Sequence, residues 1–173
     1  MDAQATRQTV LEWLDHHEIP YKLYLHEQAH TIEQCLQMPF ITNEVTICKN
    51  ILLCNRQQTR FFLLLLKPLT PFRTSVVSKA LGVSRLSFAP ENALVNMLHL
   101  ASGSLSPLGL MFDTAREITL CYEADVANSP QIAFHPCDNC ATLVFKQEVF
   151  WERLIPALRI EPIALNCVVN END

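Results

Sequence analysis

The stretch Thr46–Lys67, "TICKNILLCNRQQTRFFLLLLK", contains two runs of branched and aromatic residues that are separated by the polar residues "RQQT". Such runs are typical of β-strands, and the short polar spacer favours a hairpin or two neighbouring buried strands. The run "FFLLLL" does not alternate between apolar and polar residues, which indicates a strand buried on both faces. We therefore expect a β-sheet with this pair of strands inside the fold.

Further elements are predicted on both sides of this pair. In the first of them, apolar residues recur at helical spacing before Pro20. Gly82 is expected to close one helix, and Pro156 to shorten the last one. Helices are predicted over residues 4–17, 30–38, 73–82, 90–100 and 147–158, and strands over 21–27, 117–123 and 141–145. This order predicts an α/β (α+β) domain in which a mixed, largely antiparallel sheet is surrounded by helices.

Length and composition are those of a soluble globular chain. The 173 residues are 49% apolar, so we expect one domain over residues 1–173, with 161–173 as a C-terminal tail. The acidic N-terminus lacks the pattern of a secretory signal, and the longest apolar run is too short to span a membrane. Seven cysteines without a disulfide spacing favour a reducing, cytoplasmic location.

Charge is distributed unevenly along the chain. The formal net charge is −5, yet the segment from Val45 to Pro90 holds seven basic residues and no acidic one. An acidic protein that binds a polyanion needs such a local excess of positive charge. We therefore expect weak binding of a polyanion through five basic residues of this segment: Arg56, Arg60, Arg73, Lys79 and Arg85.

The stretch Ala133–Phe145, "AFHPCDNCATLVF", raises the question of a metal or redox site. His135, Cys137 and Cys140 could donate to zinc, but three donors within six residues seldom complete a tetrahedron alone. The strand expected after Cys140 also argues against a Cys-x-x-Cys pair at a helix start, as in thioredoxin-like proteins. Zinc deaminases combine Cys-x-Glu with Pro-Cys-x-x-Cys, but only twelve residues separate Glu123 from Pro136 here. We expect no metal and no cofactor.

Other common catalytic motifs are absent. The segment "GSLSPLG" lacks the G-x-S-x-G spacing of serine hydrolases, and the chain has no phosphate-binding G-x-x-x-x-G-K.

Six segments taken together resemble one family. They are "EIPYKLYLHEQAHTIEQ", "ICKNILLCN", "TRFFLLLL", "SKALGVSRLSFA", "GSLSPLGLMFD" and "IAFHPCDNCATL", and the match around them covers roughly residues 6–160. In this order they resemble the YbaK/ProX-type aminoacyl-tRNA deacylases, which are related to the editing insertion of bacterial prolyl-tRNA synthetases. The freestanding ProX (PrdX-like) branch is the most similar.

This resemblance implies roles for matching residues. The catalytic set is Lys49, the G-x-x-x-P loop with Gly103, Ser104 and Pro107, and His135 of "FHP". Substrate binding is implied for Asn50, Asp113, Asn139 and Thr142. For a protein that resembles this family, the polyanion expected on the five basic residues of the Val45–Pro90 segment is tRNA. Many relatives have Asn at the position of Phe112 and Thr at the position of Cys140, which makes the Cys-x-x-Cys pair incidental to the chemistry. The apolar residues nearest the motifs are expected to form the walls of the amino-acid pocket: Ile47, Leu110, Met111 and Phe134.

The function that we expect is trans-editing of mischarged Ala-tRNA(Pro). An aminoacyl ester is already activated, so a held water and an oxyanion stabilised by backbone N–H groups suffice for hydrolysis. A pocket built for proline rejects alanine by only about 1–3 kcal/mol per missing methylene, so a second selection step is needed. The expected partners are the acceptor end of tRNA(Pro) and prolyl-tRNA synthetase. Two alternatives stay open: a deacylase for another small amino acid such as cysteine, and a non-catalytic regulator that binds tRNA or synthetase.

Overall fold

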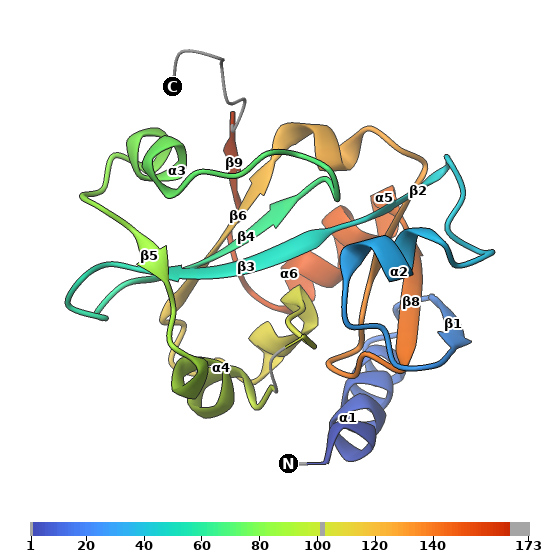
Figure 1. Cartoon of the computed structure of the whole chain (residues 1–173). Coiled ribbons are helices and arrows are strands. Elements are labelled where there is room, and N and C mark those ends of the chain that lie inside the picture. Colours follow the sequence, from blue (N-terminus) through green and yellow to red (C-terminus); the bar gives the residue numbers. More distant parts are fainter. Residues whose placement is uncertain (1, 101–102, 167–173) are drawn as a thin grey trace.

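The computed structural model describes residues 2–100 and 103–166, which form two β-sheets with helices around them (Figure 1). The four-stranded sheet has the order β1-β8-β7-β2, with β1 Lys22–Leu25, β8 Ala141–Lys146, β7 Gln131–Phe134 and β2 Val45–Ile47. The five-stranded sheet has the order β5-β3-β4-β6-β9, with β5 Ser87–Phe88, β3 Lys49–Cys54, β4 Phe61–Leu66, β6 Ile118–Glu123 and β9 Ile163–Leu165.

Both sheets contain antiparallel and parallel pairs. The predicted hairpin is β3–β4, which pairs antiparallel from Lys49↔Leu66 to Cys54↔Phe61. The pairs β4–β6, β6–β9 and β2–β7 are parallel. The predicted mixed α+β class is confirmed, but the strands form two sheets and not one. The chain passes from one sheet to the other at Cys48, between β2 and β3.

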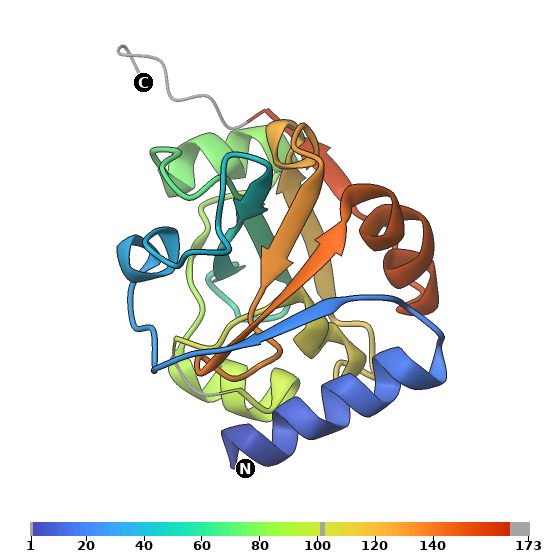
Figure 2. The same cartoon turned by 90° about the vertical axis from the view of Figure 1, so that its right-hand side faces the viewer.

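The five-stranded sheet is buried on both faces, which explains its continuous apolar runs. Along β4, Leu63 and Leu65 face the core shared with the four-stranded sheet, whereas Phe62 and Leu64 face a second cluster that includes Val77 of helix α3 (Thr74–Leu81). A third cluster packs the outer face of the four-stranded sheet against the region of helix α2 (Ile32–Leu36). The molecule is therefore layered, with a sheet on each side of the main core (Figure 2).

The helices cover these layers close to their predicted positions. They are α1 Ala3–His16, α2 Ile32–Leu36, α3 Thr74–Leu81 and α4 Glu91–Leu98, followed by a C-terminal helix made of α5 Gln147–Val149, a π-helical turn Phe150–Leu154 and α6 Ile155–Ala157. Short 3₁₀ helices cover Pro107–Met111 and Ala124–Ala127. Gly82 ends α3 in the left-handed conformation at φ 64°, as expected for a helix C-terminus.

The predicted C-terminal tail includes an ordered strand. Ile163–Leu165 forms β9, which pairs with Cys121–Glu123 at the edge of the five-stranded sheet. Residues 167–173 of the predicted tail lie outside the described residues.

Candidate active site

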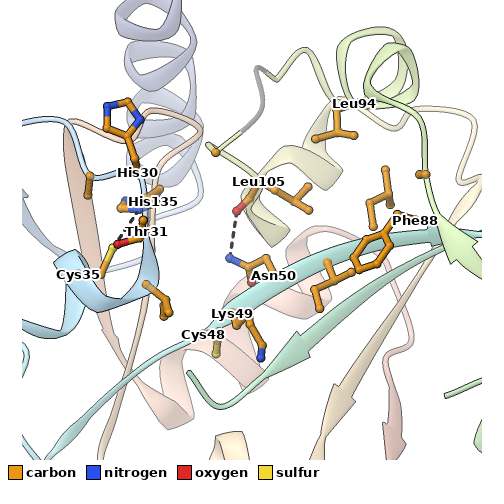
Figure 3. Close-up of a pocket in the computed structure, with 16 residues that line it drawn as sticks. His30, Thr31, Cys35, Cys48, Lys49, Asn50, Phe88, Leu94, Leu105 and His135 are labelled. Atoms are coloured by element: carbon orange, nitrogen blue, oxygen red, sulfur yellow. Dashed lines mark hydrogen bonds between the residues drawn. The ribbon is translucent and has the colours of Figure 1, made fainter. Parts of the chain in front are cut away.

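A cleft of about 300 Å³ opens where the chain passes from β2 to β3. The α2 region and His135 form one side, and β3, β5, α4 and the loop around Gly103 form the other (Figure 3). It is lined by Ala29, His30, Thr31, Ile32, Cys35, Cys48, Lys49, Asn50, Ile51, Leu52, Phe88, Ala89, Leu94, Gly103, Leu105 and His135. Three of the five predicted catalytic residues therefore line one cleft, although they come from distant parts of the chain.

Lys49 begins β3, and its ammonium is held by a neighbouring loop. Its Nζ donates to the carbonyl oxygen of Thr70 at 2.7 Å. The Thr70 hydroxyl in turn donates to the buried carboxylate of Glu123 at 3.0 Å, and the same carboxylate accepts the N–H of Lys67 at 3.1 Å. A buried acid thus fixes the turn on which the lysine rests.

Asn50 points to the other side of β3, because successive side chains of a strand alternate in direction (Figure 3). Its Nδ2 donates to the carbonyl oxygen of Leu105 at 3.0 Å, which ties the strand to the glycine loop. Its Oδ1 is buried and has no hydrogen-bond partner among the described residues. A buried acceptor without a donor is costly, so this atom is available to accept a hydrogen bond from a ligand or a water molecule.

The glycine loop presents backbone at the cleft. Gly103 has φ +87°, a conformation that other residues rarely adopt, while an added Cβ would come no closer than 3.7 Å to the Asn139 side chain. Conformation, and not crowding, therefore requires glycine here. Ser104 and Pro107 belong to the same loop but are buried behind it and do not line the cleft.

His135 has one defined tautomer in this site. Its Nδ1 lies 2.7 Å from the carbonyl oxygen of Ala141, which only accepts, so Nδ1 carries the hydrogen. In the neutral ring Nε2 is then an acceptor, and the Cys35 thiol donates to it across 3.6 Å. Burial lowers the pKa of His135, with a smaller lowering by His26 and opposite effects from the Ala141 carbonyl and Asp138. The imidazole is therefore neutral at pH 7.

A second histidine, His26, is linked to His135 through the hydroxyl of Thr142. His26 Nδ1 lies 2.7 Å from the carbonyl oxygen of Glu27, so Nδ1 donates and Nε2 accepts from the Thr142 hydroxyl at 2.9 Å. Thr142 is fully buried, and its oxygen lies 3.4 Å from Nδ1 of His135. Thr142 therefore contacts the Nδ1 side of His135 and does not line the cleft.

The lowered pKa of His135 predicts a pH dependence of stability. Between the lowered pKa of the folded state and the ordinary value of 6.5, the unfolded state binds more protons than the folded state. We therefore expect the free energy of unfolding to fall as pH drops below 6.5 and to recover as pH rises. Urea unfolding between pH 5 and 7.5 measures this slope. An equal slope in His135→Gln would contradict the assignment.

The predicted pocket walls lie outside the lining of this cleft. Phe134 and Leu110 lie in the main core, and Ile47 packs in the cluster on the outer face of the four-stranded sheet. Met111 is half-buried against the main core and also lies outside the cleft lining. Nearness in sequence to a motif does not decide which side of a sheet a residue faces. Apolar side chains from α2, β5 and α4 line the cleft instead.

Asp113 and Asn139 stabilise loops beside the cleft. The carboxylate of Asp113 accepts the backbone N–H groups of Glu117 and Ile118 at 3.1 and 2.9 Å, which closes the turn before β6. The backbone carbonyl of Asn139 accepts the N–H of Ala29 at 2.9 Å. Neither side chain lines the cleft.

The Cys-x-x-Cys segment forms a braced loop. Asp138 is 5% exposed and pairs with Arg7 of α1 at 2.7 Å, while its other oxygen accepts the N–H of Cys140 at 3.0 Å. Cys137 is buried with φ +61°, and burial raises the pKa of its thiol. Among residues 2–100 and 103–166, no cluster of three or more His, Cys, Asp or Glu side chains is placed to hold a metal ion.

The predicted tRNA-binding residues come from three elements. Arg56 and Arg60 lie at the β3–β4 turn, with the Arg60 guanidinium 5.3 Å from the ring centre of Phe62. Arg73 and Lys79 lie at the two ends of α3, and Arg85 precedes β5. All five are exposed, and none lines the cleft.

Comparison with known proteins identifies the family. The model of the aminoacyl-tRNA editing domain matches residues 26–150, which include all the cleft-lining residues. The chain belongs to the aminoacyl-tRNA editing domain family. The resemblance to YbaK/ProX-type deacylases is thereby confirmed, as is the predicted enzyme class, aminoacyl-tRNA deacylase.

Individual relatives agree with this assignment. The chain is 30% identical over 148 residues to the prolyl-tRNA editing protein ProX of Acetoanaerobium sticklandii, covering 86% of this chain and 89% of that protein. It is 27% identical over 140 residues to the prolyl-tRNA synthetase associated domain-containing protein 1 of Danio rerio, covering 79% and 74%. A solved structure described provisionally as a trans-editing enzyme for prolyl tRNA synthetase shares the fold, with a TM-score of 0.71, 13% identity and coverage of 93% and 96%. None of the helices in the described part of the chain is both long and apolar enough to span a membrane.

Proposed function

We propose that this protein hydrolyses the ester of mischarged Ala-tRNA(Pro) in trans. The observation that carries the proposal is that Lys49, Gly103 and His135 line one cleft whose buried Asn50 Oδ1 lacks a donor. An aminoacyl ester supplies such donors in its α-ammonium group and its free ribose hydroxyl. The names of the curated relatives support tRNA(Pro) as the substrate and prolyl-tRNA synthetase as a partner.

Each group has a role in this proposal. Backbone N–H groups of the Gly103 loop stabilise the oxyanion that forms when water attacks the ester carbonyl. The Lys49 ammonium leaves the Thr70 carbonyl to bind a phosphate or the carbonyl oxygen of the substrate. His135 Nε2 accepts a hydrogen bond from the attacking water or a ribose hydroxyl in place of the Cys35 thiol. These steps position a water and stabilise charge, and they need no strong nucleophile.

The end of the cleft that Cys35 and His135 line, called the small end below, supports alanine as the amino acid removed. Ala29 and Cys35 are both buried, and Ile32 lines the cleft next to them. Side chains of this size leave room for a methyl group, and each additional methylene of a larger amino acid has to be excluded sterically.

Incubation with tRNA(Pro) charged with alanine, cysteine or proline tests the proposal. We expect rapid loss of the alanyl ester only. Loss of the cysteinyl ester instead would favour the alternative deacylase. No loss of any ester would favour a non-catalytic regulator and overturn the proposal.

Cys35 offers a test of the size selection. Cys35→Ala removes one sulfur atom from the small end, so we expect the kcat/KM for the prolyl ester to rise about 10-fold relative to the alanyl ester. Cys35→Ser preserves both the size and the donor to His135, and should retain the original selectivity. An unchanged ratio in Cys35→Ala would show that the methyl group is bound elsewhere.

A further inference from the structure

An exposed aromatic ring stands at the edge of the cleft. Phe88 lines the cleft, yet 63% of its surface is exposed. It ends the two-residue strand β5, opposite Leu53 at the edge of the five-stranded sheet. Phe72 supports it edge to face, with 5.7 Å between the ring centres. A large aromatic side chain held in place and left open to solvent is typical of a binding surface.

The two ends of the cleft differ in chemistry. His135, Cys35 and His30 lie at one end, whereas Phe88 and Leu94 lie at the other (Figure 3). The Asn50–Leu105 hydrogen bond stands between the two ends. A ligand complementary to the whole cleft therefore has a small polar part at one end, a hydrogen-bond donor near Asn50 Oδ1 in the middle, and a flat apolar part at the other end.

The aromatic end also lies within the basic part of the chain. Between Val45 and Pro90 no acidic residue occurs, and the exposed Arg73 and Arg85 flank Phe72 and Phe88 in sequence. The loop that contains Phe72 also contains Thr70, the residue that holds the Lys49 ammonium. One loop therefore supports both the ring and a cation, which suits a ligand that joins a flat base to phosphates.

We propose that Phe88 is a stacking platform for the unpaired terminal base of the tRNA acceptor strand, with the amino acid bound at the His135 end. The proposal deepens the proposed function and rests on it, since it names how the substrate lies in the same cleft. Bases of single-stranded nucleic acids commonly stack on aromatic side chains next to positively charged grooves, and such stacking does not require base-specific hydrogen bonds.

Steady-state kinetics on Ala-tRNA(Pro) test the proposal. We expect Phe88→Ala to raise KM about 10-fold or more, within the range of about 5-fold to 150-fold for the loss of one stacked base, and Phe88→Tyr to restore it. Ile163→Ala is the matched control, because Ile163 is 43% exposed but lies on β9, at the opposite edge of the sheet. Unchanged KM in Phe88→Ala, or an equal rise in Ile163→Ala, would overturn the proposal.

A binding measurement separates this proposal from the proposed function. The probe is a CCA trinucleotide with 2-aminopurine in place of the terminal adenine, whose fluorescence is quenched on stacking. We expect the wild-type protein to quench it and Phe88→Ala to lose most of this quenching. Equal quenching by both proteins would overturn the stacking platform even if the alanyl ester is hydrolysed. Quenching by a wild-type protein that hydrolyses no ester would overturn the proposed function alone.

Discussion

Replacing Lys49 by alanine is expected to lower kcat/KM for hydrolysis of Ala-tRNA(Pro) by about 100-fold or more, as is usual when one charge-stabilising group is removed from an active site. The fold should persist, because the side chain is half-buried and its head group makes one hydrogen bond, to Thr70. Loss of a hydrogen bond from a charged donor costs about 1.5–3 kcal/mol, which is a fraction of the stability of a typical domain. Single-turnover deacylation together with thermal unfolding measures both effects.

Lys67→Ala is the matched control for this substitution. Lys67 belongs to the loop that holds the Lys49 ammonium and carries the same charge as Lys49, but its side chain is exposed and only its backbone N–H contacts Glu123. We expect its kcat/KM to stay within a few-fold of the wild type. If Lys49→Ala keeps wild-type turnover, or if both variants lose activity equally, Lys49 has no specific role in the chemistry.

Phe134→Ala is expected to destabilise the protein by about 4 kcal/mol, the cost of deleting a fully buried aromatic side chain. Phe134 is 1% exposed and stacks on Phe150 with 4.9 Å between the ring centres. It faces the core shared by the two sheets, directly before His135 in sequence. The substitution therefore tests whether Phe134 is a core residue or, as its position beside a motif predicts, a wall of the pocket.

Phe88→Ala makes the same chemical change at a site that is 63% exposed, so its cost in stability should be below 1 kcal/mol. Urea unfolding of both variants measures the difference. A loss of less than 1 kcal/mol in Phe134→Ala, accompanied by altered amino-acid selectivity, would return Phe134 to the pocket wall.

The longer elements could be predicted because their signals are local. Apolar periodicity places α1 within one residue of the observed start and end, and Gly82 marks the end of α3. The composition of β3 and β4 predicts their pairing. The last helix runs on through Pro156 after a π-helical turn, so the proline does not truncate it.

The division into two sheets could not be predicted in this way. It depends on strands of two to four residues, such as β2, β5 and β7, which have too few positions to display a period. Their partners lie far away in sequence; β2, for example, pairs with β7 from Val45↔Gln131 onward. Such pairing is a property of the whole fold and leaves no local pattern.

The residues of the candidate site also fall into those that the sequence predicts and those that it does not. Lys49, Asn50, Gly103 and His135 could be proposed because they occur in recognisable motifs, and all four line the cleft. The thiol that donates to His135, the second histidine and the exposed aromatic ring were missed. Cys35, His26 and Phe88 become candidates only because folding brings them next to His135, Thr142 and the cleft, respectively. Nothing in their local sequence distinguishes them from ordinary surface or core residues.

The Arg7–Asp138 ion pair shows that residues before the family match help to hold the loop next to His135. The family match starts at residue 26, but α1 and β1 precede it. A fragment trimmed to that boundary would keep every residue of the cleft, yet leave a buried carboxylate without its counter-ion and β8 without its edge partner. Residues 2–25 thus support the strand and loop that hold His135, and mobility introduced there would reach the candidate site without altering any residue that lines the cleft.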